Sequence, residues 1–389
     1  MAEKAMNSPF DRGPSLSAAA GVLTIDLSAV AANWRQLARR VAPAECAAVI
    51  KANAYGIGLE PAAFALRRAG CRTFFVAQIE EGERARAALG EGPRIFVLDG
   101  LHAGADVADY TGRALLPVIG SAGELDRWAR AERERGGPSF AIHIDTGMSR
   151  LGFASAAEAK ASLARAGIES SRVGLVLSHF VASEEPDNPR NAAQIEQFEK
   201  ARALFPGAPA SLANSSGIFL PQRPNYDLAR PGYALFGGNP TPLAKNPMKT
   251  VVKLEARIQQ VRAIEPGASV GYNAEWRAER RTRIATLLVG YADGLPRAAG
   301  ATARSRGAEV VIAGQRCPLV GRISMDLSAV DVTELREGAV RAGDFAEILG
   351  PEIGVDELGT RSGVIGYNVL TALGARYRRT YIKGPEREA

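Results

Sequence analysis

The sequence predicts an α/β protein in which a (β/α)8 barrel of the TIM type is followed by a mainly β C-terminal domain. Between about residues 46 and 237, short apolar runs alternate with longer stretches of helical periodicity rich in Ala, Arg, Glu and Leu. This alternation is typical of parallel crossover units, and eight such units can close into a barrel. After about Pro247, strand-like runs follow one another with Gly-rich turns and few helical stretches between them. A chain of 389 residues is also long enough for two domains.

Eight apolar runs are the candidate barrel strands. An open, doubly wound parallel sheet is the alternative, although no GxGxxG motif follows the first run. In a barrel, the carboxyl ends of all the strands share one rim, and the functional site lies there. The runs are residues 46–50, 73–77, 94–98, 115–119, 139–144, 173–177, 210–213 and 233–236.

The chain before and after the barrel divides into a tail and a second domain. Residues 1–21 are mostly small or polar and lack the roughly 7 to 15-residue apolar stretch of a secretory signal, so they are predicted to form a loose tail. Residues 22–247 are predicted to form the barrel, and residues 248–389 the β domain. The expected strands of this domain are residues 251–261, 283–289, 309–313, 327–332 and 345–349, with one helix around residues 364–373.

Composition narrows the class of protein. A hydrophobic content of 46% with 23% charged residues is ordinary for a globular protein, and no segment approaches about 18 consecutive apolar residues, so a membrane span is not expected. The net charge of +6 suits an anionic small molecule but is too mild to indicate nucleic acid. Cys46, Cys71 and Cys317 are odd in number and far apart, which favours buried thiols and a cytoplasmic location over a disulfide framework.

Lys51 is the most informative residue. The apolar run at residues 46–50 leads directly into it, and a lysine at the end of a buried strand cannot stay in the core unpaired. Gly56 and Gly58 follow, where the backbone can approach a ligand closely, and Tyr55 adds a hydroxyl. A carbonyl cofactor held as a Schiff base is one candidate partner for the amine. A strand-end lysine that simply reaches solvent is the alternative.

Other polar residues also fall where the predicted strands end. Singly, residues 214–217 could form an ordinary turn or helix cap, His179 could be a hydrogen-bonded core residue, and Arg230 could make a surface ion pair. Their shared place on the rim favours a phosphate-bearing cofactor beside Lys51, because N–H groups and hydroxyls there can converge on a phosphate. No metal site is predicted. The rim residues are Asp145 and Arg150 after the fifth run, His179 after the sixth, Asn214, Ser215, Ser216 and Gly217 after the seventh, and Arg230, Pro231 and Gly232 before the eighth.

Seven short motifs occur in one order along the chain. They are Ala-Val-Ile-Lys51-Ala-Asn-Ala-Tyr55-Gly, Asp145-Thr-Gly-Met-Ser-Arg150-Leu-Gly, Ser178-His179-Phe, Ala213-Asn214-Ser215, Arg230-Pro-Gly232, Gly290-Tyr291-Ala-Asp-Gly294 and Val320-Gly-Arg-Ile-Ser-Met325-Asp326. Together they resemble the motifs of alanine racemases, enzymes that use pyridoxal 5'-phosphate. The resemblance runs from about Leu23 to Tyr381, whereas the surroundings of Lys51 alone would also suit related pyridoxal phosphate barrels.

The resemblance implies a two-base mechanism. Lys51 would hold the cofactor as a Schiff base, be displaced by the substrate, and then act as the base on one face of the α-carbon. Tyr272 would act on the other face, because racemisation removes a proton from one side and delivers it to the other. A phenol is a weak base at neutral pH, and the resemblance implies a hydrogen-bond relay from Tyr272 through His179 to Arg230. Without the motifs, Tyr272 could equally be an aromatic side chain on the surface of the β domain.

The resemblance also implies how the cofactor is held. Arg230 would face the pyridine nitrogen, and because a guanidinium keeps its proton, the ring would be a weaker electron sink. That favours return of the proton to the α-carbon over transamination. His179 would lie against the pyridine ring. The phosphate would be bound by Tyr55, Ser215, Gly232 and the backbone of Tyr233, and Asn214 would also contact the cofactor.

The substrate and the quaternary structure follow from the same resemblance. Arg150 would contact the substrate carboxylate and the phenolic oxygen of the cofactor, with help from the backbone of Met325. Tyr272, Tyr291 and Met325 would reach the site from the β domain of a neighbouring subunit, which implies a homodimer with shared active sites. A site closed by Tyr291 and Met325 would favour small side chains.

Three positions depart from the family pattern. Ile57 stands where the family often has a histidine, His143 where it often has a carbamylated lysine that positions Arg150, and Ser324 where a cysteine is usual. His143 could replace that lysine as a neutral or charged group, or could simply pack in its strand.

The leading hypothesis is therefore a racemase that interconverts L-alanine and D-alanine and supplies D-alanine for peptidoglycan. A serine or broad-specificity amino-acid racemase is the closest alternative. Fold-related amino-acid decarboxylases favour a carboxylate in place of Arg230, and non-catalytic pyridoxal phosphate carriers consist essentially of the barrel alone. The sequence does not distinguish a biosynthetic from a catabolic role, and it does not predict the affinity of the dimer.

Overall fold

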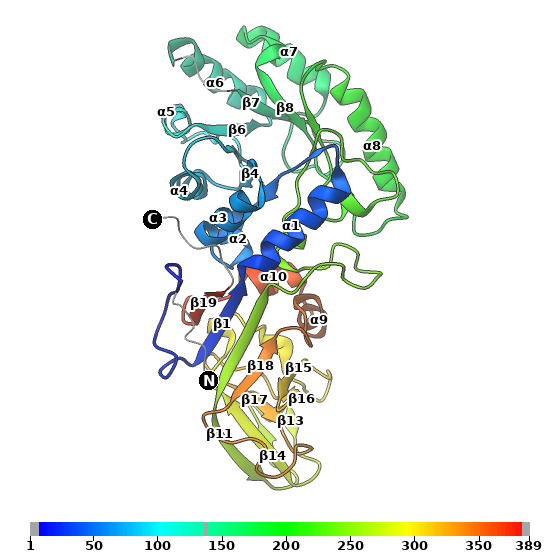
Figure 1. Cartoon of the computed structure of the whole chain (residues 1–389). Helices are drawn as coiled ribbons and strands as arrows, with labels where there is room; N and C mark the ends of the chain where they lie inside the picture. The colour runs from blue at the N-terminus through cyan, green and yellow to red at the C-terminus, as the bar shows by residue number, and fades with distance from the viewer. Residues whose placement is uncertain (1–7, 136–138, 383–389) are drawn as a thin grey trace.

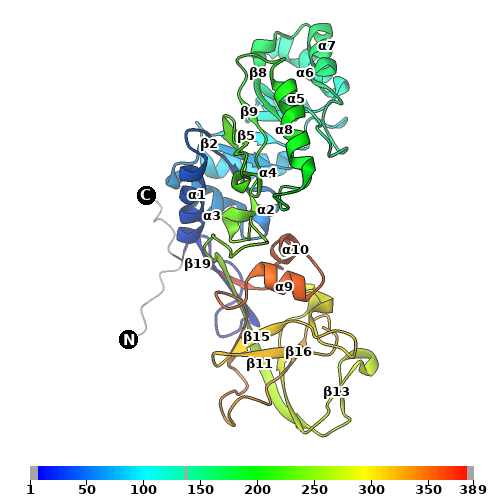
Figure 2. The ribbon, with the colours of Figure 1, turned by 90° about the vertical axis from the view of Figure 1, so that its right-hand side faces the viewer.

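The computed structural model describes residues 8–135 and 139–382. The barrel occupies one end of an elongated molecule and the β domain the other, as Figure 1 shows. Helices α9 (Val355–Arg361) and α10 (Gly366–Thr371) lie between the two, which is clearest in Figure 2. Both predicted parts of the fold, the barrel and the mainly β domain after it, are confirmed.

Seven barrel strands form one parallel sheet, and an eighth position closes it. The sheet runs in the order β3 to β9, and β2 (Glu45–Cys46) pairs in parallel with β10 (Leu228–Ala229). Arg230 N–H donates to Ala213 C=O at 2.8 Å, and Val49 N–H donates to Pro231 C=O at 2.9 Å, so β10 and the residues after it join the two ends of the sheet. The sheet strands are β3 (Ala48–Val49), β4 (Thr73–Val76), β5 (Arg94–Val97), β6 (Leu115–Ile119), β7 (Phe140–His143), β8 (Val173–Leu177) and β9 (Ala210–Ser211).

The apolar runs form these strands because each is covered on both faces. All four residues of β4 are buried, as expected where side chains alternate between the barrel interior and the surrounding helices. Asp26 caps the first helix by accepting from the N–H groups of Ser28 and Ala29. The helices of the barrel are α1 (Leu27–Val41), α3 (Leu59–Ala69), α4 (Ile79–Leu89), α5 (Val107–Thr111), α6 (Ala122–Arg135), α7 (Ala156–Ala166) and α8 (Pro189–Arg202).

The prediction for the eighth strand was wrong. Residues 233–236 form a 3-10 helix, η3 (Tyr233–Phe236), and the strand is β10, a few residues earlier. All four residues of η3 are buried. A short apolar run that is buried on every side carries no periodicity to separate a strand from a helical turn, which explains the error.

The β domain is built on a sheet in the order β14, β17, β16, β15, β18, β11, β1 and β19. Strand β14 also pairs with β11, so six of these strands form a closed ring. The buried and partly exposed residues of the first half of β11 alternate, as in a strand with one face in a core. The strands are β1 (Gly21–Asp26), β11 (Val252–Ile264), β14 (Thr282–Leu287), β15 (Glu309–Ile312), β16 (Gln315–Val320), β17 (Ser328–Asp331), β18 (Phe345–Leu349) and β19 (Arg378–Ile382), with the separate pair β12 (Ser269–Val270) and β13 (Trp276–Arg277).

The start of the chain belongs to this second sheet. Strand β1 pairs antiparallel with β11 and parallel with β19. In the segment before β1, the Asp11 carboxylate accepts from Tyr381 N–H at 3.0 Å, and Arg12 forms a β-bridge with Arg379. Residues 8–20 therefore differ from the loose tail predicted for residues 1–21. Their partners, such as Tyr381, Arg379 and Arg257, lie far away in sequence, where no local pattern reveals them. Residues 1–7 of that prediction lie outside the described residues.

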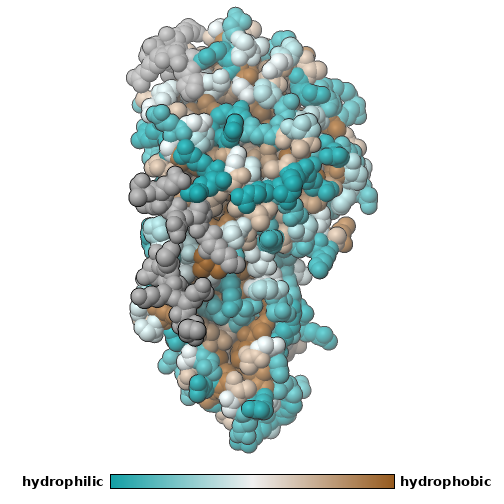
Figure 3. Space-filling view, in the orientation of Figure 1, coloured by the Kyte–Doolittle hydropathy of each residue, from teal (hydrophilic) through white to brown (hydrophobic). Residues whose placement is uncertain are grey.

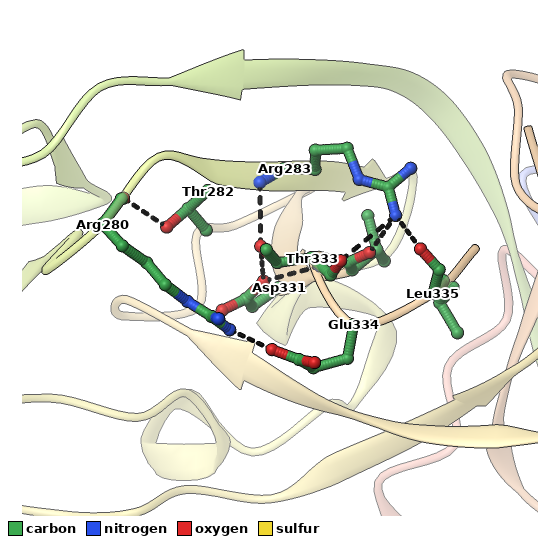
Figure 4. Close-up of polar contacts among 8 residues, drawn as sticks. Arg280, Thr282, Arg283, Asp331, Thr333, Glu334 and Leu335 are labelled. Carbon is green, nitrogen blue, oxygen red and sulfur yellow. Dashed lines mark hydrogen bonds and ion pairs between the residues drawn. The ribbon is translucent and has the colours of Figure 1, made fainter. Parts of the chain in front are cut away.

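A polar cluster closes the end of the β domain that is distant from the barrel. Arg283 N–H donates to the Thr333 hydroxyl at 2.9 Å, and its guanidinium reaches the carbonyls of Val332 and Leu335, as Figure 4 shows. Arg280 pairs with Glu334 in the same view. These bonds fix the connection that follows β17 against the start of β14. The opposite end of the domain faces the barrel (Figure 1).

The surface is mixed in hydropathy, and Figure 3 shows apolar patches over the β domain among otherwise polar residues. No helix within residues 8–135 and 139–382 is long and apolar enough to cross a membrane.

Candidate active site

A cavity of about 480 Å³ opens at the carboxyl ends of the barrel strands. Nine barrel residues predicted to bind the cofactor or the substrate line it, and they come from five different strand ends. Of the other rim residues named from the sequence, Asp145, Ser216, Gly217 and Pro231 do not line it. His143, the departure at the end of β7, also lines the cavity, whereas Ile57 is fully buried in the core and does not. The predicted residues present are Lys51, Tyr55, Arg150, His179, Asn214, Ser215, Arg230, Gly232 and Tyr233.

Lys51 begins a turn of unusual hand. Segment α2 (Lys51–Tyr55) contains four consecutive residues, Ala52 to Tyr55, with φ between 52° and 55°. Each non-glycine residue in this left-handed conformation costs roughly 1–2 kcal/mol. Strain of this kind persists only where surrounding contacts impose it, and it often marks a functional site. Here the left-handed segment brings both Lys51 and Tyr55 to the cavity within five residues.

Polar side chains around Asn53 hold this turn. Asn53 N–H donates to the Glu81 carboxylate at 3.2 Å, and the Asn53 side-chain oxygen accepts from Leu59 N–H at 3.0 Å and from Arg84 at 2.9 Å. Arg84 is fixed in turn by an ion pair with Glu60 at 2.7 Å. These side-chain contacts add to the backbone bonds of the turn itself, in which Ala54 N–H donates to the Ile50 carbonyl and Gly56 N–H to the Ala52 carbonyl.

The Lys51 amine is prepared to act as a nucleophile. Burial lowers its pKa, and the nearby charge of Arg150 lowers it further, while Asp99 and Glu81 partly oppose the shift. A lowered pKa increases the fraction of neutral amine, the form that attacks a carbonyl group. Asp99 lines the cavity beside Lys51, and burial raises the pKa of its carboxyl group.

Another part of the cavity is an anion cradle, a set of hydrogen-bond donors around Tyr55, Ser215 and Gly232. The Ser215 hydroxyl accepts from Gly232 N–H at 3.0 Å and from Ala234 N–H at 3.2 Å, so two backbone N–H groups at the start of η3 point at one spot. Tyr55 closes over it: a Cβ added to Gly232 would lie 2.3 Å from the Tyr55 hydroxyl oxygen. Converging N–H groups and hydroxyls suit a phosphate, so these residues fit the phosphate of pyridoxal phosphate.

Arg230 is buried, with 5% of its surface exposed, and is not a surface ion pair. Its guanidinium donates to the Ser211 hydroxyl and to the Ser178 carbonyl, both at 2.5 Å. Burial lowers the pKa of Arg230 to about 10, which still leaves it charged at neutral pH. The two hydrogen bonds fix a permanent donor at the floor of the cavity.

Two neutral histidines stand near this cation. Burial and the charge of Arg230 lower the pKa of His179 to about 3 and that of His143 to about 4. Both imidazoles are therefore uncharged at neutral pH, and each can accept a hydrogen bond on one nitrogen. Arg150 lowers both pKa values as well, so the positive charge of the cavity resides on arginine and lysine.

Arg150 reaches the cavity from a tightly bonded loop. The Asp145 carboxylate accepts from the N–H groups of Gly147, Met148 and Ser149, each at 2.8 Å. Ser149 adopts a left-handed φ of 57° directly before Arg150. This loop after β7 explains why an aspartate begins the Asp-Thr-Gly-Met-Ser-Arg motif: its side chain shapes the backbone that presents the arginine.

The three predicted residues of the β domain do not line the cavity of the same chain. Tyr272, Tyr291 and Met325 are 63%, 40% and 54% exposed. Tyr272 begins the short helix η4 (Tyr272–Ala274), and Tyr291 begins η5 (Tyr291–Asp293). Large exposed apolar side chains gathered in one domain are typical of an interaction surface.

The sequence reasoning missed several cavity residues. Tyr367 and Thr371 reach it from α10, and the Tyr367 ring stacks on Tyr233 with centroids 3.8 Å apart. These residues lie late in the chain, and nothing in their local sequence indicates a barrel rim. Leu98 and Asp99, by contrast, follow β5 directly, and the same strand-end rule that selected Lys51 could have found them.

Gly232→Ala should weaken binding of pyridoxal phosphate, because the new methyl group would displace the Tyr55 hydroxyl from the cradle. A hydrogen bond to a charged group is worth roughly 1.5–3 kcal/mol, so the Kd should rise about 10- to 100-fold. Titration of the apoprotein with the cofactor, followed by absorbance, measures it. Gly354→Ala is the matched control, because a Cβ there would meet nothing within 4 Å. An unchanged Kd in Gly232→Ala would remove this cradle from consideration.

Comparisons with known proteins agree with this geometry. The family model "Alanine racemase, N-terminal domain" matches residues 25–240, and "Alanine racemase, C-terminal domain" matches residues 251–381. An alanine racemase of Methylobacterium sp. (strain 4-46) is 52% identical and covers 92% of this chain and 97% of that protein. One of Rhizobium meliloti (strain 1021) is 43% identical over 96% of this chain and 100% of that protein. The crystal structure of alanine racemase from Bartonella henselae with covalently bound pyridoxal phosphate aligns with a TM-score of 0.86 and 38% identity over 94% of this chain and 100% of that one. The chain therefore belongs to the alanine racemase family.

Proposed function

We propose that this protein is a pyridoxal-phosphate-dependent racemase that interconverts L-alanine and D-alanine. The observation that carries the proposal is the convergence of the Lys51 amine, the buried Arg230 and the Ser215–Gly232 anion cradle in one cavity. Membership of the family supports it, as does the cofactor bound by the Bartonella henselae relative. We further propose that the product supplies D-alanine for peptidoglycan.

Each residue of the cavity has a role in this reaction. When bound, pyridoxal phosphate supplies a conjugated ring that delocalises the negative charge left on the α-carbon after its proton is removed. Lys51 would hold the cofactor and then exchange a proton with one face of the α-carbon. Tyr55, Asn214, Ser215, Gly232 and the backbone of Tyr233 would hold the phosphate end.

Arg230 and His179 would control where the proton goes. Arg230 is locked by Ser211 and Ser178 and would donate a hydrogen bond to the ring nitrogen without releasing a proton to it. Burial, together with the fixed charge of Arg230, lowers the pKa of His179 and keeps it neutral, so His179 would pass a hydrogen bond to Tyr272 rather than a net charge. We propose that Arg150 pairs with the substrate carboxylate, with neutral His143 beside it.

The second base would come from another copy of the chain. Tyr272, Tyr291 and Met325 are exposed on the β domain and absent from the cavity of their own chain. A homodimer that seats the β domain of each subunit over the barrel mouth of the other would cover these side chains and complete both sites at once. Two-fold symmetry makes such an arrangement self-consistent, because the same pair of surfaces meets twice.

The alternatives are weaker on specific grounds. A decarboxylase of this fold favours a carboxylate opposite the ring nitrogen, where Arg230 would lie in this chain. A non-catalytic carrier would be essentially a barrel alone, whereas family models match both domains of this chain. A serine or broader racemase uses the same machinery and differs only in side-chain selection. The three cysteines are free and buried, which supports a cytoplasmic location.

Lys51→Ala should abolish the visible absorbance of the bound cofactor together with racemase activity, because no other amine of the cavity can take its place. The absorption spectrum of the purified protein is the measurement. Lys200→Ala is the control, since this lysine lies on α8 in an exposed ion pair with Glu196. Persistence of the visible band in Lys51→Ala would contradict the proposed role of this amine.

Tyr272→Phe should lower the turnover rate by about 10² to 10⁴, the usual contribution of a general acid or base. Racemisation should slow equally in both directions, because the two enantiomers have equal free energy. Exchange of the α-proton should be lost mainly with L-alanine, whose proton Tyr272 would remove, because Lys51 remains to act on the other face. Exchange of the α-proton in heavy water, with the chirality of the product recorded for alanine and for serine, measures both direction and specificity.

Tyr377→Phe is the control for this change, since the buried Tyr377 hydroxyl has no hydrogen-bond partner among the described residues. An equal loss of α-proton exchange with L-alanine and with D-alanine in Tyr272→Phe would argue against a one-sided base.

A further inference from the structure

We propose that Arg376 is a positioning residue that holds Tyr291 and Met325 in place for the active site of the neighbouring subunit. The proposal rests on the shared-site homodimer proposed above. It concerns two aspartates, Asp293 and Asp326, which lie within the sequence motifs of Tyr291 and Met325 and have no part in the reaction described so far.

Arg376 binds both aspartates at once. Its Nε and Nη2 donate to the two carboxylate oxygens of Asp293 at 2.7 and 2.8 Å, a two-point pairing, and its Nη1 donates to Asp326 at 2.7 Å. The Asp293 carboxylate is buried and also accepts from Gly290 N–H at 2.9 Å. The guanidinium therefore spans from an interior carboxylate to a surface one.

The two aspartates belong to two loops that already touch. Tyr291 N–H donates to Ser324 C=O, and Ala292 N–H donates to Met325 C=O, both at 3.0 Å. Gly290 allows this approach, because a Cβ there would lie 2.3 Å from the Met325 carbonyl oxygen. Residues 290–294 and 324–327, named here the paired loops, thus form one unit that presents Tyr291 and Met325 together.

An arginine is suited to hold such a unit. The side chains of Tyr291 and Met325 project from the paired loops and are largely exposed, so packing within their own chain does little to orient them. A planar guanidinium can make three directed hydrogen bonds to two carboxylates, whereas a lysine ammonium acts as a point charge on a flexible stem. Arg376 therefore restricts the angle between the loops as well as their separation.

Arg376 also lies close in sequence to residues of its own cavity. It follows α10, the helix that carries Tyr367 and Thr371 to the barrel rim of the same chain. Gly374 N–H, between the two, donates to the Asp293 carbonyl at 3.0 Å. Loss of Arg376 would thus affect contacts near both cavities, and we assign its main effect to the cavity of the partner.

Arg376→Gln should lower kcat/KM for alanine by about 10²-fold, the scale of loss when a supporting residue lets a site shift by about 1 Å. The effect should be larger on KM than on kcat, because Met325 is proposed to contact the substrate carboxylate. The visible absorbance of the cofactor should stay unchanged, since the barrel is intact. Arg376→Lys should fall between Arg376→Gln and the unaltered protein.

Two further variants make this kinetic test specific. Arg316→Gln is the matched control, because Arg316 also pairs with two carboxylates of the same domain, Glu309 and Glu357, outside the paired loops. It should leave kcat/KM unchanged. Asp326→Asn removes only the exposed half of the contact and should raise KM less than Arg376→Gln does. An unaltered KM in Arg376→Gln would overturn the proposal.

Hybrid dimers decide which cavity Arg376 serves. A dimer of one Lys51→Ala subunit and one Arg376→Gln subunit, purified through two different affinity tags, contains one barrel with Lys51 opposite a β domain with Arg376. If Arg376 serves the partner, this hybrid should show about half the activity of the unaltered dimer with an unaltered KM, since one of two symmetric sites is complete. A raised KM in the hybrid would mean that Arg376 acts within its own chain, and would overturn the proposal.

A second hybrid separates failure of this inference from failure of the shared site. A dimer of Lys51→Ala and Tyr272→Phe subunits should also recover about half the activity if the sites are shared. Recovery in that hybrid without recovery in the Arg376→Gln hybrid would overturn only the role of Arg376. Absence of recovery in both would refute the shared site itself, and the role of Arg376 with it.

Discussion

The left-handed turn that begins at Lys51 is the constraint on which the site depends. A buried strand must deliver an amine to the barrel mouth and then reverse within a few residues so that Tyr55 faces the same cavity. The backbone conformation is costly, and Asn53, Glu81 and Arg84 stabilise it from one side. From the other side, the last strand of the chain supports it: Arg379 donates to the Gly56 carbonyl at 2.6 Å, and the Tyr381 hydroxyl donates to the Ile57 carbonyl at 2.7 Å.

The charge of the cavity also depends on which side chains the strand ends bring to it. Lys51, Arg150 and Arg230 gather positive charge around a space lined by hydroxyls and N–H groups, which suits a phosphorylated cofactor and a substrate carboxylate. Burial and these same charges keep both histidines neutral. A neutral His143 lines the cavity together with Arg150, and the loop bonded to Asp145 presents that arginine.

The sequence predicted the site well where its residues directly follow a barrel strand. Apolar runs located seven of the eight barrel strands, and most of the polar residues predicted at their ends line the cavity, although Asp145 and Ser216 do not. The eighth strand was misplaced because the run at residues 233–236 is buried on all sides. Tyr367 was missed because only the tertiary fold brings α10 to the barrel rim, and the pairing of β1 with β19 was missed because neither strand carries a local signal of its partner. The assignments of Tyr272, Tyr291 and Met325 rest on resemblance, since no pattern in one chain reveals a contact between two.

The position of β1 has a consequence for how the protein is made. This strand lies between β11 and β19, so the barrel is in effect an insertion within the second sheet. On the ribosome, the first strand emerges early, yet its parallel neighbour is not available until residue 378 has been synthesised. The barrel can assemble while translation continues, whereas the sheet beneath it stays incomplete until the chain is almost finished. Because that strand also braces the turn after Lys51, a truncated translation product would carry a barrel in which Lys51 is poorly held.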